Sequence, residues 1–281
     1  MATQALAQPA PVPAQIKLRQ SVTQLSAAEL SRFRTVMGTF VARPDNKGFQ
    51  YFANWHGVAF DLCQHHNDFF LPWHRGYLYH FELALQDIDP EVTVPWWNWM
   101  DEPGLPASFT DASADNVLLG APIRPFGVQV QPHWPAQTSR DPGAPPGPGQ
   151  GPAPLPPPLR TGTKAGKPYN YYDWMMSSPS YSQFEQRCWQ LHDNIHDWVG
   201  GTMGDQNWAA FDPIFWAHHS MVDRLWRIWQ HNNPSAVPPD DVLDSSMTFA
   251  TAPSLKVRDV LDVTRLGYDY AAQTASASGT A

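Results

Sequence analysis

The histidines with the most informative spacing lie in the second half of the chain. His192 and His196 are four residues apart with no helix breaker between them, so a helix would place both imidazoles on one face. A lone pair with this spacing is more often a pair of core histidines. Here Asp212 and Pro213 cap a second apolar-periodic run that contains His219. Three imidazoles from two helices could bind one metal ion.

A second group of histidines lies in the first half of the chain. His56, His65 and His74 are spaced nine residues apart, and His74 is near the start of a predicted helix. Three imidazoles from each half would form two three-histidine sites. Imidazole ligands without carboxylates favour copper or zinc over magnesium, calcium or a di-iron carboxylate cluster. Two neighbouring metals, each with an open position, indicate a small bridging ligand such as dioxygen.

The elements that must position these histidines are mainly helical. Ser26 and Glu29 have the spacing of a capping box before a helix-periodic segment. Pro72 marks the start of another helix, which Asp89 and Pro90 end. We expect four main helices with long irregular loops and few short strands. A bundle of this kind can hold a metal site in its core.

We expect a single domain over residues 1–281. Residues 1–20 and 268–281 are predicted to be flexible tails, because they offer little to bury. Residues 141–159 are predicted to be a surface loop, since their proline and glycine cannot form a helix interior or a central strand. An insertion without a specific function is the favoured interpretation of this loop over a lid or a partner-docking segment. The aromatic stretch 94–99 is expected in the core.

Composition excludes several classes of partner. The net charge is −8 without a basic stripe, which argues against nucleic acid. The two cysteines, Cys63 and Cys188, cannot form a disulfide framework. No apolar run reaches the ~20 residues that a membrane span needs. The N-terminal segment lacks the basic and apolar regions of a signal peptide, so we expect a cytoplasmic protein, or one secreted with a partner that carries the signal.

Four segments resemble the signatures of type 3 copper proteins. The first copper signature is matched by HHNDFFLPWHRGYLYHFE and the second by DPIFWAHHSMVD. The paired-histidine helix is matched by LHDNIHDWVGG, and a P-Y-W-D-W element by PWWNW, in which Asn98 replaces the Asp. The matches span residues 55–229. The class includes tyrosinases, catechol oxidases, o-aminophenol oxidases and molluscan haemocyanins, and this chain is similar to the short bacterial form without a C-terminal lid domain.

The resemblance implies a tyrosinase-like four-helix bundle around two copper ions, with O2 as co-substrate. It assigns one copper to His56, His65 and His74, and the other to His192, His196 and His219. By the same resemblance His218 lies behind the ligands and His66 is not a ligand. His80, His133 and His231 match nothing and are expected to be structural or solvated. Cys63 stands where fungal tyrosinases and molluscan haemocyanins join a cysteine to the histidine corresponding to His65 by a thioether; the alternative is a free buried thiol.

The implied activity is that of a tyrosinase, or polyphenol oxidase. Such an enzyme ortho-hydroxylates monophenols and oxidises o-diphenols to o-quinones. Catechol oxidase and o-aminophenol oxidase are the alternatives, followed by an oxygen carrier of the haemocyanin kind. A zinc hydrolase would explain only HDNIH, and Asp193 is shorter than the Glu base of that motif. Expected partners are a small phenol, O2 and, as in some short bacterial relatives, a copper-delivering accessory protein.

Further roles follow from the same resemblance. Phe215 is expected beside the copper cluster, and Glu185 is expected to hold a water that helps to deprotonate the phenol. Asp193 stands where hydroxylating members often have Asn. With Asp197, Met203 and Gly204 it is expected to line the substrate pocket. Two carboxylates there would disfavour acidic substrates.

Overall fold

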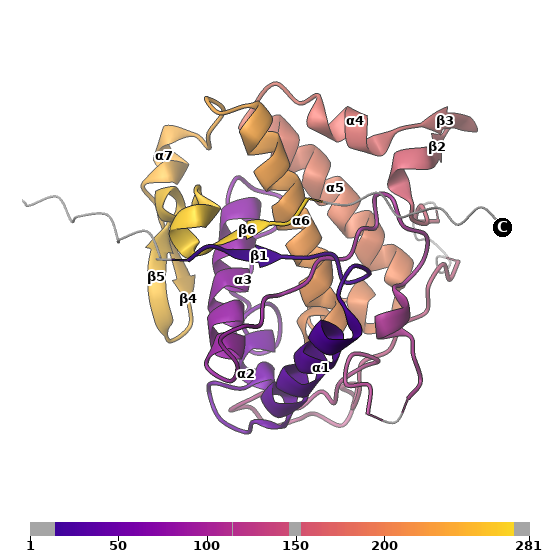
Figure 1. Cartoon of the computed structure of the whole chain (residues 1–281), viewed down its shortest axis with the longest axis vertical. Coiled ribbons are helices and arrows are strands. Elements are labelled where there is room, and N and C mark those ends of the chain that lie inside the picture. Colours follow the sequence, from indigo (N-terminus) through magenta and orange to yellow (C-terminus); the bar gives the residue numbers. More distant parts are fainter. Residues whose placement is uncertain (1–14, 114, 146–152, 273–281) are drawn as a thin grey trace, which may run out of the picture.

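Helices dominate the computed structural model, which describes residues 15–113, 115–145 and 153–272. The four longest helices in these ranges are α1 (Ala27–Ala42), α3 (Phe70–Gln86), α5 (Tyr181–Val199) and α6 (Pro213–Asn232). The shorter ones are α2 (Phe49–Ala53), α4 (Tyr171–Met176) and α7 (Asp240–Leu243). Helix α3 packs against α1, α5 and α6 (Figure 1). This confirms the predicted mainly α-helical class. None of the described helices has the length and apolar character of a membrane span.

Single turns of 3₁₀-helix punctuate the long connections. They are Ala107–Phe109, Leu159–Thr161, Gly201–Gly204, Ala209–Phe211, Val257–Val260 and Val263–Leu266. The predicted helix starts agree with the structure: Ser26 and Glu29 form the capping box of α1, and Asp212 caps α6 with Pro213 in the first turn. Helix α3 begins two residues before Pro72, so this proline lies in the first turn, where its missing N–H costs no hydrogen bond.

The strands form three two-stranded sheets. Strand β1 (Lys17–Arg19) pairs in parallel with β6 (Tyr268–Tyr270). The other two are hairpins, formed by β2 (Gly162–Lys164) with β3 (Lys167–Tyr169) and by β4 (Ser246–Phe249) with β5 (Ala252–Lys256). The first pairing corrects the prediction of two flexible tails, because residues 17–19 and 268–270 hold each other. The rest of those tails, 1–14 and 273–281, lies outside the described residues.

The described parts of the proline- and glycine-rich segment lie along α5. Asp141 and Gly143 donate their backbone N–H groups to the carbonyls of Val199 and Trp198, each at 2.8 Å. Further on, the side chain of Asn194 pairs with the backbone of Leu155 through two hydrogen bonds of 2.7 and 2.8 Å. Residues 146–152 of the segment lie outside the described part. The segment therefore follows one helix on both sides of this gap.

Aromatic side chains fill the core, as expected for residues 94–99. Trp96, Trp97 and Trp99 are fully buried. Phe81 of α3 stacks on Trp216 of α6, with ring centroids 3.4 Å apart. Large planar side chains of this kind bury much apolar surface in a fixed geometry. They hold α3 and α6 in one register.

A buried ionic network joins the same two helices to the strand pair. Arg75 of α3 lies 2.5 Å from Asp223 of α6, and both are almost fully buried. Arg19 of β1 binds Asp223 as well, at 3.3 Å, while the hydroxyls of Tyr268 and Tyr270 in β6 donate to the same carboxylate. Although burial opposes ionisation, Arg75 and Arg19 lower the pKa of Asp223 below its usual range. The network explains why residues 17–19 and 268–270 of the predicted tails are held against the helices.

We expect Asp223→Ala to lower the free energy of unfolding by about 3–5 kcal/mol, because it leaves two buried guanidinium groups without their shared counter-ion. Asp269→Ala is the control, since it removes the partly exposed pair with Arg227 and should cost about 0–1 kcal/mol. Urea unfolding of the metal-free proteins measures both. Equal losses would contradict the structural role assigned to the network.

Candidate metal centre

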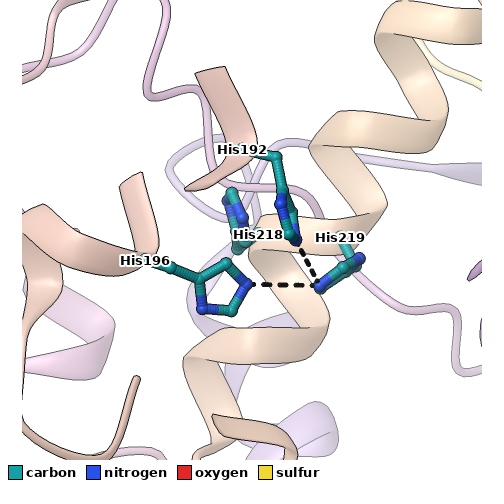
Figure 2. Close-up of side chains that lie close together, drawn as sticks. All are labelled: His192, His196, His218 and His219. Carbon is teal, nitrogen blue, oxygen red and sulfur yellow. Dashed lines mark hydrogen bonds between the residues drawn. The ribbon is translucent and has the colours of Figure 1, made fainter. Parts of the chain in front are cut away.

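Four imidazoles meet between α5 and α6. His192 and His196 come from one face of α5, and His218 and His219 come from α6 (Figure 2). The Nε2 atom of His219 lies 3.1 Å from Nε2 of His192 and 3.4 Å from Nε2 of His196. The second predicted triad is therefore brought together, with Nε2 of His219 in contact with Nε2 of both other rings.

The opposite ring nitrogens have partners that fix the rings. His196 donates from Nδ1 to the carbonyl of Met203 at 2.7 Å. His192 directs Nδ1 to the carboxylate of Asp193 at 2.9 Å. Because these oxygens only accept, Nδ1 carries the hydrogen and Nε2 keeps its lone pair. Lone pairs that face one another in this way need a cation between them, which is the arrangement of a metal site.

The first predicted triad has the same organisation. His74 lies in α3, His56 follows α2, and His65 lies in the loop before α3. Their ring centroids are 5.1–5.7 Å apart. Nδ1 of His56 donates to the carbonyl of Gln206 at 3.1 Å, and Nδ1 of His74 to that of Phe70 at 2.8 Å. Nε2 of both rings is buried and has no hydrogen-bond partner in the described structure.

The two triads face each other directly. His74 and His219 stack with centroids 4.4 Å apart and planes 15° apart. The ring centroids of His65 and His192 are 5.9 Å apart. Ligand atoms of His56, His74 and His219 all lie within 4.8 Å of one another, so the structure joins the two groups into one cluster.

Of the remaining histidines, His218 belongs to the same cluster, because its ligand atom lies within 4.8 Å of those of His192, His196 and His219. His66 points away from the triads to Asp193, at 2.8 Å, and packs on Trp189. His218 is completely buried between His192 and His196, and neither of its nitrogens has a hydrogen-bond partner within the described residues. His80 is buried in the aromatic core, whereas His133 and His231 are exposed.

A cavity of about 220 Å³ opens onto this cluster. It is lined by His56, His65, His66, His192, Asp193, His196, Asp197, Met203, Gly204, Gln206 and Ala209. Both aspartates, Met203 and Gly204 thus lie where the pocket residues were expected. Phe215 lies behind the cluster, with its ring centroid 4.2 Å from that of His219. The cavity can hold one aromatic ring beside the imidazoles.

Comparison with known proteins identifies this arrangement. The profile of the common central domain of tyrosinase matches residues 46–232. The chain belongs to the tyrosinase family. Its relatives include the tyrosinase of Streptomyces glaucescens, 31% identical over 218 residues that cover 71% of this chain and 78% of that one. The tyrosinase of Streptomyces lincolnensis is 29% identical over 263 residues, which cover 87% of this chain and 90% of that one.

Solved structures place the fold beside both enzymes and oxygen carriers. The tyrosinase of Burkholderia thailandensis aligns with a TM-score of 0.70 at 24% identity, over 92% of this chain and 74% of that one. Deoxygenated haemocyanin of Rapana thomasiana aligns with a TM-score of 0.73 at 25% identity, over 92% and 70%. The predicted family and fold are confirmed, and the chain is a copper oxidoreductase of the tyrosinase type.

The electrostatics of the tyrosinase site suit copper. Burial lowers the pKa of His56, His74, His192 and His219 well below the usual range, and neighbouring imidazoles lower it further. The pKa of His65 falls to about 4 for the same first reason. Neutral imidazole is the form that binds metal. The donor set, its protonation and its unpartnered Nε2 atoms therefore fit the copper that the family implies.

Gln206 is a site residue that the sequence did not reveal. Its carbonyl accepts from His56, and its side-chain amide lies 3.1 Å from the sulfur of Cys63. The Cys63 sulfur and the ligand atoms of His56 and His65 lie within 4.8 Å of one another. Burial and the nearby Asp61 raise the pKa of Cys63 to about 12, so the thiol is protonated. Because Gln206 acts on His56 through its backbone carbonyl, which every residue has, the sequence gives no signal for this role.

Glu185 differs from its predicted role. It lies on α5 two turns before His192, but its carboxyl faces the backbone N–H of Leu71 at 3.3 Å and the hydroxyl of Tyr181 at 3.0 Å. It does not line the cavity. Burial, reinforced by the Asp68 carboxylate, raises the pKa of Glu185 to about 9 against these hydrogen bonds. The prediction fails because α3 covers this part of the helix face.

The raised pKa of Glu185 predicts a pH-dependent stability. The unfolded chain ionises this group near 4.5, while the folded protein keeps it protonated up to about 9. Its contribution is therefore complete below pH 4.5 and is lost as the pH rises towards 9. We expect Glu185→Gln to gain stability relative to the original protein over this range. Urea unfolding of the metal-free proteins at several pH values checks this, and parallel curves would contradict it.

Proposed function

We propose that this chain binds two copper ions, uses O2 to hydroxylate monophenols at the ortho position, and oxidises o-diphenols to o-quinones. Overall, one monophenol and one O2 give one o-quinone and one water. Bound copper would supply the activation of O2 and the transfer of electrons. The observation that supports two ions is the pair of facing triads: Nε2 of His56 and of His74 is buried without a partner in the described structure, and Nε2 of His219 lies 3.1 Å from that of His192.

The protein's own contribution is to orient the imidazole rings and to select which face of the cluster the phenol reaches. Backbone carbonyls of Phe70, Met203 and Gln206 hold three of the rings through Nδ1. Phe215 excludes water from the inner side of the cluster because it is fully buried against it. The cavity on the outer side is open to a phenol. These residues fix which ring nitrogen faces the metal and which face the substrate reaches.

Asp193 is the group that we assign to proton transfer in place of Glu185. Its carboxylate lines the cavity and contacts both His192 and His66. A phenol ionises near pH 10, so its oxygen must lose a proton before it binds as a phenolate. An aspartate at the wall is placed to accept that proton.

A haemocyanin-like oxygen carrier is the second candidate. It is favoured by the octopus haemocyanin of Enteroctopus dofleini, 27% identical over 289 residues that cover 90% of this chain and 22% of that one. The open cavity argues against it, because a carrier must keep phenols from the bound oxygen. Catechol oxidase and o-aminophenol oxidase use the same metal centre and differ in the phenol accepted.

Oxygen uptake by the copper-loaded protein tests these candidates. A monophenol, an o-diphenol and an o-aminophenol should each be consumed, with a lag for the monophenol. Uptake with the diphenol alone would indicate a catechol oxidase, and uptake with the aminophenol alone an o-aminophenol oxidase. Reversible oxygen binding without product would indicate a carrier and contradict the proposal.

We expect His219→Ala to reduce the bound copper from two ions to about one and to abolish turnover, since it removes the ring that contacts both triads. His231→Ala is the matched control, because His231 is an exposed residue at the end of the same helix. Metal analysis and oxygen uptake give both results. Full copper content in the His219 variant would contradict the ligand assignment.

We also propose that Cys63 and His65 become joined by a thioether. A bond forms from the sulfur to a ring carbon, the S–H and C–H hydrogens leave as two protons and two electrons, and O2 is the oxidant. Cys188 provides an internal control, because it is a buried free cysteine. Under denaturing conditions, protein exposed to copper and O2 should show one reactive thiol and copper-free protein two. Two thiols in both samples would contradict the bond.

A further inference from the structure

A second, larger hollow adjoins the copper cavity. It measures about 970 Å³ and runs along the outer face of α5. We call it the outer groove, and its described walls include Leu155, Lys164, Tyr171, Trp189, Gln190 and Asn194. Asp193, Asp197 and Gly204 line both the groove and the cavity. A molecule in the cavity can therefore continue into the groove.

The boundary between the two spaces is formed by His66 and its contacts with α5. His66 packs on Trp189 with ring centroids 4.3 Å apart and binds Asp193 at 2.8 Å. This holds the loop before α3 against α5. These contacts of His66 separate the two spaces. The phenol ring would bind on the cavity side, and its substituent would extend to the Trp189 side.

The volumes indicate the size of that substituent. The cavity of about 220 Å³ accommodates a single ring, whereas the groove is several times larger. A simple phenol or a free amino acid would leave the groove empty. The space fits a phenol attached to an extended chain.

The groove walls suit a peptide main chain. Asn194 already binds the backbone of Leu155 through both of its amide atoms, which is the pairing that an extended peptide offers. Gln190 lies one turn earlier on the same face and is exposed, and its side chain makes no hydrogen bond within the described residues. Its amide is free to bind a substrate backbone in the same manner.

Charge completes the description. Asp193 and Asp197 stand where cavity and groove meet, against the single cation Lys164 among the described walls. Asp197 forms no ion pair in the part of the chain described, although burial and the nearby Asp193 raise its pKa. Basic groups next to the phenol would be attracted there and acidic ones repelled.

On the basis of the proposed function, we infer that the preferred substrates are tyrosine side chains in peptides with basic residues beside the tyrosine. The ring would enter the copper cavity, and the peptide backbone would lie along Gln190 and Trp189. The flanking basic side chains would approach Asp197. Small phenols would be oxidised with lower efficiency because they forgo these contacts.

Blocking the groove on the outer face of α5, opposite the face that carries His192 and His196, tests the inference. Gln190→Trp should lower kcat/KM for a lysine-flanked tyrosyl peptide about tenfold and leave 4-methylphenol unchanged. Gln186→Trp is the matched control, since Gln186 is exposed one turn earlier on α5 and does not line the groove. It should change neither value.

Charge reversal gives an independent measurement. Lys164→Glu should raise kcat/KM for the lysine-flanked peptide about threefold, whereas Lys167→Glu, on the paired strand and outside the groove walls, should not. An inference of groove binding is overturned if Gln190→Trp affects both substrates equally or neither, or if a glutamate-flanked peptide is preferred. If the original protein oxidises 4-methylphenol but the groove substitutions leave kcat/KM for the peptide unchanged, only this inference fails. If it oxidises no phenol, the proposed function fails with it.

Discussion

The contact between α3 and α6 is the constraint on which the metal centre depends. His74 and His219 stack across this contact, and the residues that lock it are their neighbours along each helix. Arg75 directly follows His74, and Asp223 lies one turn after His219. A buried ion pair tolerates little displacement, because sliding either helix would move a charge away from its counter-ion and into an apolar core. The geometry that joins the two triads is thus fixed by charges that touch no metal.

The irregular segments fulfil an equally specific requirement. Imidazoles that bind a metal through Nε2 need their hydrogens on the nitrogen that faces away from the metal. For His56, His74 and His196 the acceptors are backbone carbonyls at 2.7–3.1 Å, two of which belong to the connection between α5 and α6. Buried lone pairs without partners are costly, and bound copper would offset that cost.

Local signals explain what could be predicted from the sequence. The caps at Ser26 and Asp212, and the spacing of His192 and His196, act within one or two helical turns. The errors concern distant partners. Arg19 lies in a segment that was predicted to be a flexible tail, because its pairing with residues 268–270 cannot be read from the local sequence. Glu185 shares a helix face with His192, yet only the packing of α3 decides what it meets. Gln206 acts through its carbonyl, which any residue could supply.

Helix α5 shows how binding and selection can coexist on one element. Its inner face carries His192 and His196, and its outer face carries Gln190 and Asn194 about 100° and more away around the helix. Asp193 and Asp197 each follow a ligand by one residue and so fall on the boundary between the faces. Their carboxylates reach the cavity without competing for the inner positions. Substitutions on the outer face can therefore change the substrate without changing the donor set, because the helix backbone keeps the two faces apart.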